Sequence, residues 1–306
     1  MTKKYLFLFV LVLISFCIAA IYTYNTYYLL YYTPSDMTGN ILTVDRYGGI
    51  ILLKLRDYKI RKEIINEGNS EIIYSHPVFF GKYNVLFERT NVMEMDCLLY
   101  NYNISDNTRT IVGKYDKNDL YPSISHDLKL MAIYRRNRAS NLNDEGVIEV
   151  REISSNKLIK SSKIKSAPAK SAWGMNDRTL FTTAIINNVS WIVKNYIENN
   201  KIDTICYGSH PSISNSKDLL AYIDSGSIVI CDTLGREKHK LRSNNILVKT
   251  LSETPLAWSP NDRYIVYCGE GILSKMYPTY NLYAINVANN KIYTLLKNID
   301  IDCDWQ

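Results

Sequence analysis

Four histidines are the side chains of this sequence best suited to metal or acid–base chemistry. His76 and His210 each stand directly before a proline, His126 follows Ile124 by two residues, and His239 lies in a charged stretch. Imidazole nitrogens bind transition metals, so matched histidines could form a metal or ligand site. The alternative is that each histidine satisfies backbone groups of a turn before proline. No acidic partner recurs beside the matched pair, which weighs against the metal site.

The chain lacks the local motifs of common catalytic sites. It contains no Gly-x-Ser-x-Gly elbow, no phosphate-binding glycine-rich loop, no His-Glu-x-x-His pair and no EF-hand series. Asp224 and Glu270 fall in expected turns, where they could bind a ligand or simply form the turn. We therefore assign no catalytic, cofactor-binding or metal-binding residue, expect no cofactor, and favour a non-enzymatic function.

A repeated sequence motif, here called the phrase, runs along the chain and defines the elements that must position these residues. It is clearest from Thr254 to Tyr267, as TPLAWSPNDRYIVY, and each copy joins an apolar strand, a polar turn and a second apolar run. Intervals of 40–49 residues separate the apolar residues that open the copies, which are Phe79, Ile124, Trp173, Ile213, Trp258 and Trp305. Each interval accommodates about four strands of five or six residues, the content of one β-propeller blade.

A second repeated element follows each phrase, namely two apolar runs joined by a polar turn. Asn and Asp tolerate the left-handed backbone of tight turns, so these elements are predicted hairpins. Their centres are Asp106-Asn107, Ser155-Asn156, Asn199-Asn200, Leu234-Gly235 and Asn289-Asn290. The phrase and the hairpin recur in the same order along the chain, which predicts an all-β repeat fold.

The first unit lacks an opening strand, and the last unit has one to spare. Residues 40–44 supply a strand and residues 50–65 a hairpin, with Gly48-Gly49 as the turn between them, whereas no hairpin follows residues 301–305. We predict that the C-terminal strand pairs into the first blade and closes a six-bladed β-propeller, because closure removes exposed sheet edges.

The string from Pro255 to Tyr267 resembles the repeat of TolB-like (WD-like) β-propellers, whose core reads Trp-Ser-Pro-Asp-Gly-Lys. The resemblance extends over about residues 38–306, although no copy retains the Asp-Gly pair. It implies a propeller fold and a capacity to bind other molecules, and it carries over no catalytic residue. True WD repeats match less well, because no Trp-Asp dipeptide ends the units.

The placement of His76 and His210 also resembles that of propeller lyases acting on oligogalacturonate, which hold a metal with histidines from several blades. In a six-bladed ring these histidines would belong to blades that face each other across the axis. The resemblance implies a metal or ligand site at one mouth of the channel, with His126 in a nearby blade.

An uncharged apolar segment stands ahead of the propeller. Residues 5–22 follow Lys3 and Lys4 and are long enough to span a bilayer, and tyrosines typical of the membrane interface follow them. The alternatives are a signal peptide cleaved after Ala20 and a first helix buried in the fold. We predict a cytoplasmic N-terminus at 1–4, an uncleaved signal anchor or transmembrane helix at 5–22, a tyrosine-rich linker at 23–37 and the propeller at 38–306.

The surface charge of the propeller is balanced. The formal net charge is +6, with 36 basic and 30 acidic residues, and Lys3 and Lys4 precede the apolar segment. Basic clusters at residues 135–138 and 157–165 fall in or beside predicted turns and are interpreted as solvated loops. Nucleic acid is therefore not an expected partner. The 25 tyrosines are interpreted as blade packing, with an aromatic binding surface as the alternative.

The six cysteines form neither a zinc motif nor a disulfide framework. None stands in a Cys-x-x-Cys pair, and Cys17 lies in the apolar segment, which leaves an odd number for the propeller. Cys268 and Cys303 could meet near the closure of the ring. The default interpretation is that of small buried hydrophobic residues, for Cys97, Cys206, Cys231, Cys268 and Cys303.

These observations favour a membrane-anchored β-propeller on the extracytoplasmic side, in the cell envelope. Its expected role is a binding or scaffold module for a protein or cell-envelope partner, with the loops at the two mouths as the recognition surface. One alternative is a carbohydrate-active lyase or hydrolase that uses the central channel, and another is a structural accessory of an envelope complex. The fold alone does not distinguish these functions.

Overall fold

The computed structural model of the protein covers the propeller and a short part of the N-terminal segment. Residues 12–17 are helical and exposed, and the rest of the predicted anchor at 5–22 lies outside the described residues, as does most of the linker at 23–37. Among the residues that are described, no helix has both the length and the apolar character needed to cross a membrane. The described residues are 12–17, 33–57, 59–69, 71–93, 96–116, 120–136, 145–165, 169–199, 201–236, 239–241, 248–250, 254–271 and 280–306.

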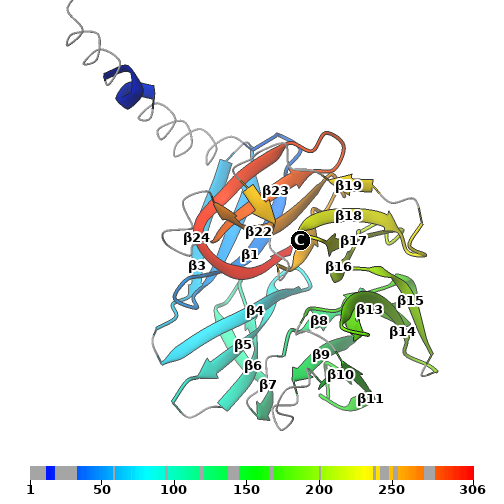
Figure 1. Cartoon of the computed structure of the whole chain (residues 1–306). Helices are drawn as coiled ribbons and strands as arrows, with labels where there is room; N and C mark the ends of the chain where they lie inside the picture. Colours follow the sequence, from blue (N-terminus) through cyan, green and yellow to red (C-terminus); the bar gives the residue numbers. More distant parts are fainter. Residues whose placement is uncertain are drawn as a thin grey trace, which may run out of the picture.

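Antiparallel strands make up almost all of the described chain, and the sheets are arranged around a common centre as the blades of a β-propeller (Figure 1). The short 3₁₀ helix η2 (Met175–Asp177) precedes β13. From the centre outward, the four-stranded sheets are β4 (Ile72–Phe80), β5 (Asn84–Asn91), β6 (Asp96–Asn103) and β7 (Thr108–Asp116); β8 (Ser123–Ile124), β9 (Leu130–Arg136), β10 (Glu145–Glu152) and β11 (Leu158–Lys165); β12 (Ala172–Trp173), β13 (Thr179–Ile186), β14 (Val189–Tyr196) and β15 (Ile202–Tyr207); and β16 (Ser209–Ile213), β17 (Leu219–Asp224), β18 (Ser227–Asp232) and β19 (His239–Leu241).

An eight-stranded sheet joins the two ends of the chain. The strand β24 is 14 residues long, and it pairs with β23 along its first half and with β1 along its second half. One long strand therefore links the C-terminal hairpin to the N-terminal one. The strands of this sheet are β20 (Val248–Thr250), β21 (Leu256–Trp258), β22 (Tyr264–Gly271), β23 (Tyr280–Asn286), β24 (Ile292–Trp305), β1 (Gly39–Asp45), β2 (Ile50–Arg56) and β3 (Lys59–Asn66).

The pairing of β24 with β1 confirms the predicted pairing of the C-terminal strand with the first unit. Thr43 lies opposite Cys303, and Asn40 and Gln306 exchange backbone hydrogen bonds of 2.7 and 2.9 Å. Gly39 has a φ of +116°, and a Cβ at this position would lie 2.6 Å from the Gln306 carbonyl oxygen. The close approach of the two chain ends therefore requires glycine.

The hairpin turns fall where the sequence predicts them. Gly48 adopts a φ of 74° in the turn between β1 and β2. Asn200 lies outside the described residues, so the turn predicted there stays a prediction. The second residue of the other predicted turns has left-handed backbone, with φ between 52° and 80°, at Asn107, Asn156, Gly235 and Asn290.

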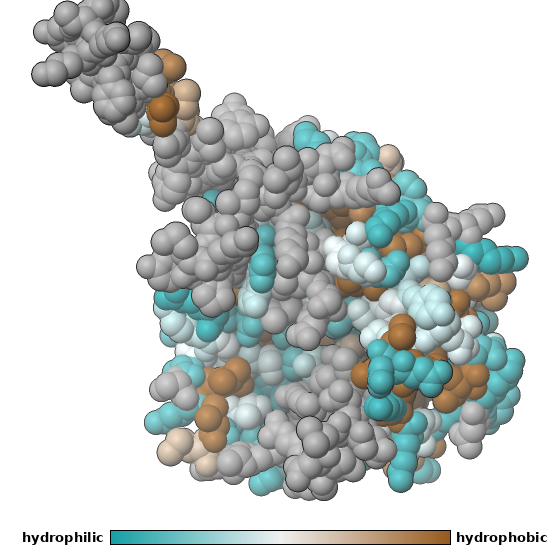
Figure 2. Space-filling model, in the orientation of Figure 1, coloured by the Kyte–Doolittle hydropathy of each residue, from teal (hydrophilic) through white to brown (hydrophobic). Residues whose placement is uncertain are grey.

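Apolar side chains fill the spaces between neighbouring sheets. Leu42 and Leu52 of the first hairpin, for example, pack with Phe87 of β5. This arrangement confirms the interpretation of the tyrosines as packing residues, because many are buried in these layers, among them Tyr102, Tyr134, Tyr222, Tyr264, Tyr267 and Tyr283. Hydrophobic and hydrophilic residues are mixed across the coloured part of the face shown in Figure 2, as expected for strands with one solvated side.

The propeller cysteines are buried free thiols, as predicted. Cys268 of β22 and Cys303 of β24 belong to one core cluster beside the ring closure. Burial, and then the adjacent Cys303 side chain, raises the pKa of the Cys268 thiol well above its usual value. These thiols therefore act as small apolar packing groups in the closed ring.

Candidate functional site

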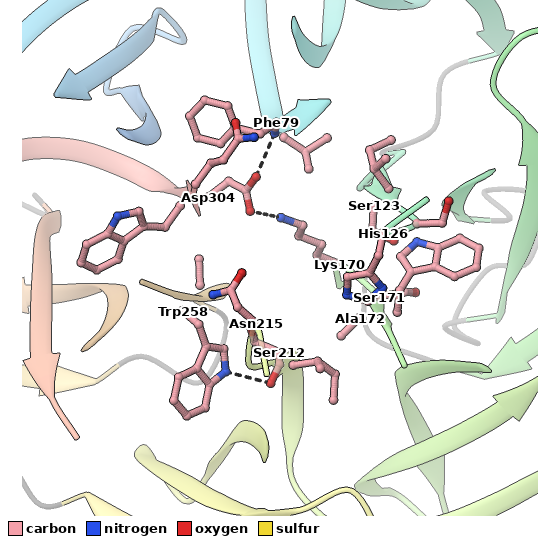
Figure 3. A pocket seen from close by; sticks show the side chains of 18 of the residues that line it. Phe79, Ser123, His126, Lys170, Ser171, Ala172, Ser212, Asn215, Trp258 and Asp304 are labelled. Atoms are coloured by element: carbon pink, nitrogen blue, oxygen red, sulfur yellow. Dashed lines mark hydrogen bonds and ion pairs between the residues drawn. The ribbon is translucent and has the colours of Figure 1, made fainter. Parts of the chain in front are cut away.

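The inner strands surround a central cavity of about 450 Å³, viewed closely in Figure 3. The repeat brings the same position of each unit to one axis, because the inner strands all approach the axis in the same orientation. The apolar residue that opens each copy lies in an inner strand and lines this cavity, namely Phe79, Ile124, Trp173, Ile213, Trp258 and Trp305.

Short side chains keep the cavity open at its middle. In the closing strand, the residue directly before the opening tryptophan is charged, namely Asp304. In the other inner strands the same position holds a small side chain, at Val78, Ser123, Ala172, Ser212 and Ala257. The charge at this level of the cavity thus comes from the strand that joins the ends of the chain.

Lys170 reaches across the cavity to Asp304 (Figure 3). Its Nζ lies 2.6 Å from Asp304 Oδ1, and the Phe79 backbone N–H donates a 2.8 Å hydrogen bond to Asp304 Oδ2. The Lys170 and Asp304 side chains are 23% and 15% exposed, so both charges are largely removed from water. Such a pair is sensitive to loss of one partner, because the other charge is then left without compensation.

His76 binds the closing strand and is not among the residues that line the cavity. Its backbone N–H donates to Asp302 Oδ2 at 3.0 Å, its Nδ1 lies 3.1 Å from Asp302 Oδ1, and its ring stacks on Tyr121 with centroids 3.8 Å apart. Burial alone would raise the pKa of the Asp302 carboxyl, but the charge and hydrogen bonds of His76, together with the charge of Lys170, hold that pKa below its usual value. His76 therefore helps to close the ring, a role that differs from both sequence interpretations.

Two polar groups in the cavity wall have no hydrogen-bond partner within the described chain. They are the Ser123 hydroxyl and the Trp173 indole N–H, and each residue is 3% exposed. At the equivalent position of a later unit, by contrast, Trp258 Nε1–H donates to the Ser212 carbonyl at 3.2 Å. A buried polar group without a partner costs about 1–3 kcal/mol, so these two groups reduce the local stability of the cavity wall.

His126 lies at the rim of the cavity and is held by Asp177 of the next sheet. Its Nδ1 is 2.7 Å from Asp177 Oδ1, and the same carboxylate accepts two backbone N–H groups of that turn at 2.9 Å each. Asp262 accepts the backbone N–H groups of Asn215 and Ser216 in the same way, at 2.7 and 2.8 Å. Both aspartates stand four residues after an opening tryptophan, so they fix the rim turn of one sheet to the next.

His210 is buried in β16, and its ring Nδ1 has no partner among the described residues. Its backbone N–H donates to Thr183 Oγ1 at 3.0 Å, and burial lowers the pKa of the imidazole to about 4. His76 and His210 share a left-handed φ of 51° and 55°, which confirms that they occupy matched positions. Neither lines the central cavity, so the fold does not bring them to a common site there.

Stability should fall as the pH falls from about 6.5 to about 4, and His210→Gln should remove most of that loss. The folded-state pKa is lowered, so within this window the unfolded chain binds a proton that the folded chain does not. The loss of folding free energy that comes from His210 reaches about 3 kcal/mol at a pH of about 4. Urea unfolding of the full-length chain at several pH values measures it. His239→Gln, at an exposed position of β19, is the matched control, and equal pH slopes for the two variants would contradict this assignment.

The acidic residues weighed as ligand groups lie away from the central cavity. Asp224 ends β17 and accepts a 3.0 Å hydrogen bond from the Ser225 hydroxyl. Glu270 lies inside β22 opposite Tyr280, so the prediction that it occupies a turn is wrong. Strand β22 continues further than the repeat phrase indicates, because β20 and β23 pair with its end.

The basic clusters weighed as solvated loops lie on strands. Arg135 belongs to β9 and donates a 2.8 Å hydrogen bond to Glu149, whose other oxygen accepts one from Arg151. The second cluster runs along β11, the outermost strand of its sheet, where Lys160 is partly buried and Lys163 and Lys165 are exposed. The expectation of loops is therefore wrong at Arg135 and in β11, while residues 137–138 lie outside the described chain.

Within the described part of the chain, no three His, Cys, Asp or Glu side chains lie close enough together to hold a metal ion. Of the histidines weighed for a metal site, His126 lines the central cavity, while His76 and His210 do not. The groups that the cavity does present are an ion pair and short side chains. This set can hold a polar or charged segment of a bound molecule.

Comparison with known proteins shows what this architecture resembles. No protein-family model matches the sequence, and no curated protein matches it by sequence. TolB from Acinetobacter baumannii superposes with a TM-score of 0.70 at 14% identity, over 94% of this chain and 70% of that one. The chain has a TolB-like β-propeller fold. A putative TolB from Agrobacterium tumefaciens gives a TM-score of 0.59 at 14% identity, over 86% and 90% of the two chains.

Another structural neighbour comes from a different setting. A chain in a nidogen–laminin complex gives a TM-score of 0.63 at 9% identity, over 87% of this chain and 97% of that one. At these identities the likeness concerns the fold alone, so the site of this TolB-like propeller rests on its own residues.

Sequence reasoning did not single out Lys170 and Asp304. Asp304 directly precedes an opening tryptophan, at a position where the other copies carry small side chains. Lys170 precedes Trp173 by three residues, and the same position in the other copies carries His76, Tyr121, His210, Pro255 and Asp302. A charge at an otherwise uncharged repeat position is the signal that could have found Asp304, whereas the repeat position of Lys170 is polar in most copies and gives no such signal. Their mutual contact could not have been found in this way, because it spans 134 residues of sequence.

Proposed function

We propose that this protein is a membrane-anchored, extracytoplasmic propeller that acts as a binding or scaffold module for a protein or cell-envelope partner. The TolB-like fold supports a rigid module whose loops and central cavity can receive another molecule. The similarity to a chain from a nidogen–laminin complex is consistent with a protein partner. The central cavity with its Lys170–Asp304 ion pair is the observation that carries the proposal.

We infer that the ring has six blades. The central cavity is lined by β4, β8, β12, β16, β21 and β24, each from a different repeat unit. On this view the eight-stranded sheet is two blades, and β24 is the outer strand of one and the inner strand of the next. This count agrees with the spacing of the opening residues in the sequence.

The partner is expected to enter through the rim of the cavity where Gln306 lies. Gln306→Trp should therefore reduce partner capture at least tenfold, a loss of about 1.4 kcal/mol, because the indole would cover the mouth. The backbone bonds between Gln306 and Asn40 do not depend on the side chain and should survive. Pull-down of crosslinked partners by the full-length chain from solubilised membranes measures the effect.

The control for this experiment is Lys163→Trp, which places the same indole on the exposed outer strand β11. Both variants should keep the wild-type melting temperature. Equal capture by wild type, Gln306→Trp and Lys163→Trp would refute the cavity as the binding site, and failure of the wild type to capture any envelope component would refute the partner function.

The membrane anchor rests on the apolar run of residues 5–22 behind Lys3 and Lys4. An intact anchor should keep the protein in the membrane fraction through salt and carbonate washes, and detergent should release it. Replacing Leu11 and Leu13 by Lys should shift the protein to the soluble fraction, because charges near the middle of a spanning helix cost about 3 kcal/mol each. Release of the wild type by carbonate, or cleavage after Ala20, would contradict the anchor.

The alternative function is a carbohydrate-active lyase or hydrolase that uses the central channel. The fold is compatible with it, since an oligogalacturonate lyase from Vibrio parahaemolyticus is similar at a TM-score of 0.50 and 12% identity. The histidine geometry gives it less support, because His76 is bound to Asp302 and His210 is buried. Release of unsaturated product from polygalacturonate, followed by ultraviolet absorbance, would favour it over the binding module.

A further inference from the structure

A second cavity, of about 670 Å³, lies between the hairpin β2–β3 and the turns of the neighbouring sheet β4–β7. Its apolar wall includes Leu52 and Ile104, and the half-exposed ring of Tyr83 stands at its side. The rest of its wall is strongly basic, with Lys54, Arg56, Lys59, Arg61 and Lys82. We call this cavity the basic groove.

Strand pairing gathers most of these cations on one face of the hairpin. Lys54 lies opposite Arg61, and Arg56 lies opposite Lys59. Side chains two residues apart on a strand point to the same side, so all four project from one face of the β2–β3 ladder. Lys82 approaches the same cavity from the turn between β4 and β5. The basic groove is therefore built from two sheets.

The charge in the basic groove is not balanced by the protein. Glu63 lies 2.7 Å from Lys54 and 3.5 Å from Arg61, so one carboxylate serves both of these cations. Asp57 is the acidic residue of the lining. In the described chain no carboxylate lies within ion-pair distance of the remaining cations, which are Arg56, Lys59 and Lys82.

Uncompensated cations that face one cavity repel one another, and an anion placed between them removes that repulsion. Guanidinium and ammonium groups bind phosphate oxygens well, Arg through paired donors and Lys as a point charge. An apolar wall beside the cations suits a ligand with a charged head and an apolar remainder. Tyr83 adds an amphipathic ring of the kind enriched where membrane and water meet.

The basic groove opens at the mouth of the propeller where the described propeller chain begins, at residues 33–36. Lys82 follows the opening residue Phe79 by three positions, and Asn261 follows Trp258 by three, so both lie in rim turns at the same mouth. The Asn261 side chain donates to the Asp36 carbonyl at 2.7 Å, which fixes the start of the described propeller chain at that mouth. The chain before Thr33 therefore joins the ring on the side of the basic groove.

The Asp36 side chain also fixes the start of the described propeller chain at this mouth. Its carboxylate accepts hydrogen bonds of 2.8 Å from Arg263 and 2.7 Å from the Tyr264 hydroxyl. These bonds, with that from Tyr264 first, lower the pKa of the Asp36 carboxyl. At neutral pH the entry of the chain into the propeller is thus fixed relative to the basic groove.

We propose that the basic groove binds the phosphate of anionic phospholipid headgroups at the membrane surface beside the anchor. The chemistry recognised is a phosphodiester anion, and the lipid is its source because the N-terminal segment enters at the same mouth. The choice of lipid as the source rests on the anchor in the proposed function. Binding would orient this mouth of the propeller towards the bilayer.

The test is isothermal titration of the full-length chain, held in uncharged detergent micelles, with dioctanoyl phosphatidylglycerol. Arg56→Gln/Lys59→Gln/Lys82→Gln should weaken binding about a hundredfold, because each basic residue near an anionic lipid contributes about a fivefold factor. Added salt should weaken binding by the wild type, as expected for exposed charges. Dioctanoyl phosphatidylcholine, which carries no net charge, should bind at least tenfold more weakly than the anionic lipid.

The matched control is Lys157→Gln/Lys163→Gln/Lys165→Gln, which removes the same charge from exposed positions around β11. It should change binding less than twofold. Equal weakening by the two triple variants, or equal binding of the two lipids, would overturn the basic groove as the site. Groove-dependent binding of glycerol 3-phosphate as tight as that of the lipid would overturn the lipid source. The assay does not depend on insertion of residues 5–22 or on a protein partner, so its failure is distinct from failure of the proposed function.

Discussion

Deleting residues 301–306 should abolish the cooperative unfolding transition of the whole propeller. The deletion removes the inner strand that pairs with β1, including the burial of Cys303 and Trp305. It also removes Asp302 and Asp304, whose carboxylates bind β4. These losses together exceed the total stability of about 5–15 kcal/mol that a folded domain possesses. Thermal unfolding of the full-length chain and of the deletion variant, followed by circular dichroism, measures the effect.

Smaller changes in the same strand should give a graded series. Trp305→Ala should destabilise the ring by about 4 kcal/mol, because a large buried side chain is replaced by a cavity. Gln306→Ala should have almost no effect, since Gln306 takes part in closure through its backbone. A deletion variant with the wild-type melting temperature would show that the ring does not depend on this strand. The same result would also argue against a ring of six blades.

Asp304→Ala should destabilise the propeller by about 3 kcal/mol and lower the melting temperature by about 10 °C. The substitution leaves the largely buried Lys170 ammonium and the Phe79 backbone N–H without their Asp304 partner. Most of the lost stability comes from the buried Lys170 charge that remains, and much less comes from the lost attraction between Lys170 and Asp304. Urea unfolding of the full-length chain gives the free energy directly.

The double variant Lys170→Met/Asp304→Leu distinguishes this explanation from simple loss of a contact. It removes both charges at once and should recover most of the stability, with a coupling energy of about 2 kcal/mol in the double-mutant cycle. A control pair is Lys201 and Asp203, which form an ion pair of 3.0 Å on the exposed surface. Their coupling should stay below about 1 kcal/mol. Additive effects of Lys170→Met and Asp304→Leu would rule out the proposed coupling.

The strands and turns of this fold were largely predictable because they depend on local patterns. Alternating apolar residues predict β1 and the hairpin β2–β3, and the left-handed turns fall at Asn107 and Asn156 as the sequence indicates. The extra strand at the C-terminus could also be predicted, because the first unit lacked an opening strand and the last unit had an additional one. Glu270 was misplaced because the end of β22 is set by its neighbours β20 and β23 and not by its own turn residues.

The candidate site was much less predictable. The matched positions of His76 and His210 were visible in the sequence, and their shared left-handed backbone bears this out. Their environments were not visible, because His76 meets Asp302 across 226 residues of sequence, whereas His210 is buried with its ring Nδ1 unpartnered in the described chain. The alternation of Lys54 and Arg56 with Lys59 and Arg61 across a turn was present in the sequence, but residues 50–65 were assigned only as the hairpin of the first unit.

The sequence by itself determined the repeat unit, its register and the strand that closes the ring. These features follow from side-chain periodicity and turn chemistry, which act over a few residues and need no knowledge of distant contacts. The tertiary structure alone decided which charges meet, as in the Lys170–Asp304 pair, and which polar groups stay unpartnered in the cavity. It also joined two sheets to form the basic groove. The physical reason is that ion pairing and desolvation depend on distances across the closed ring, and those distances exist only after closure.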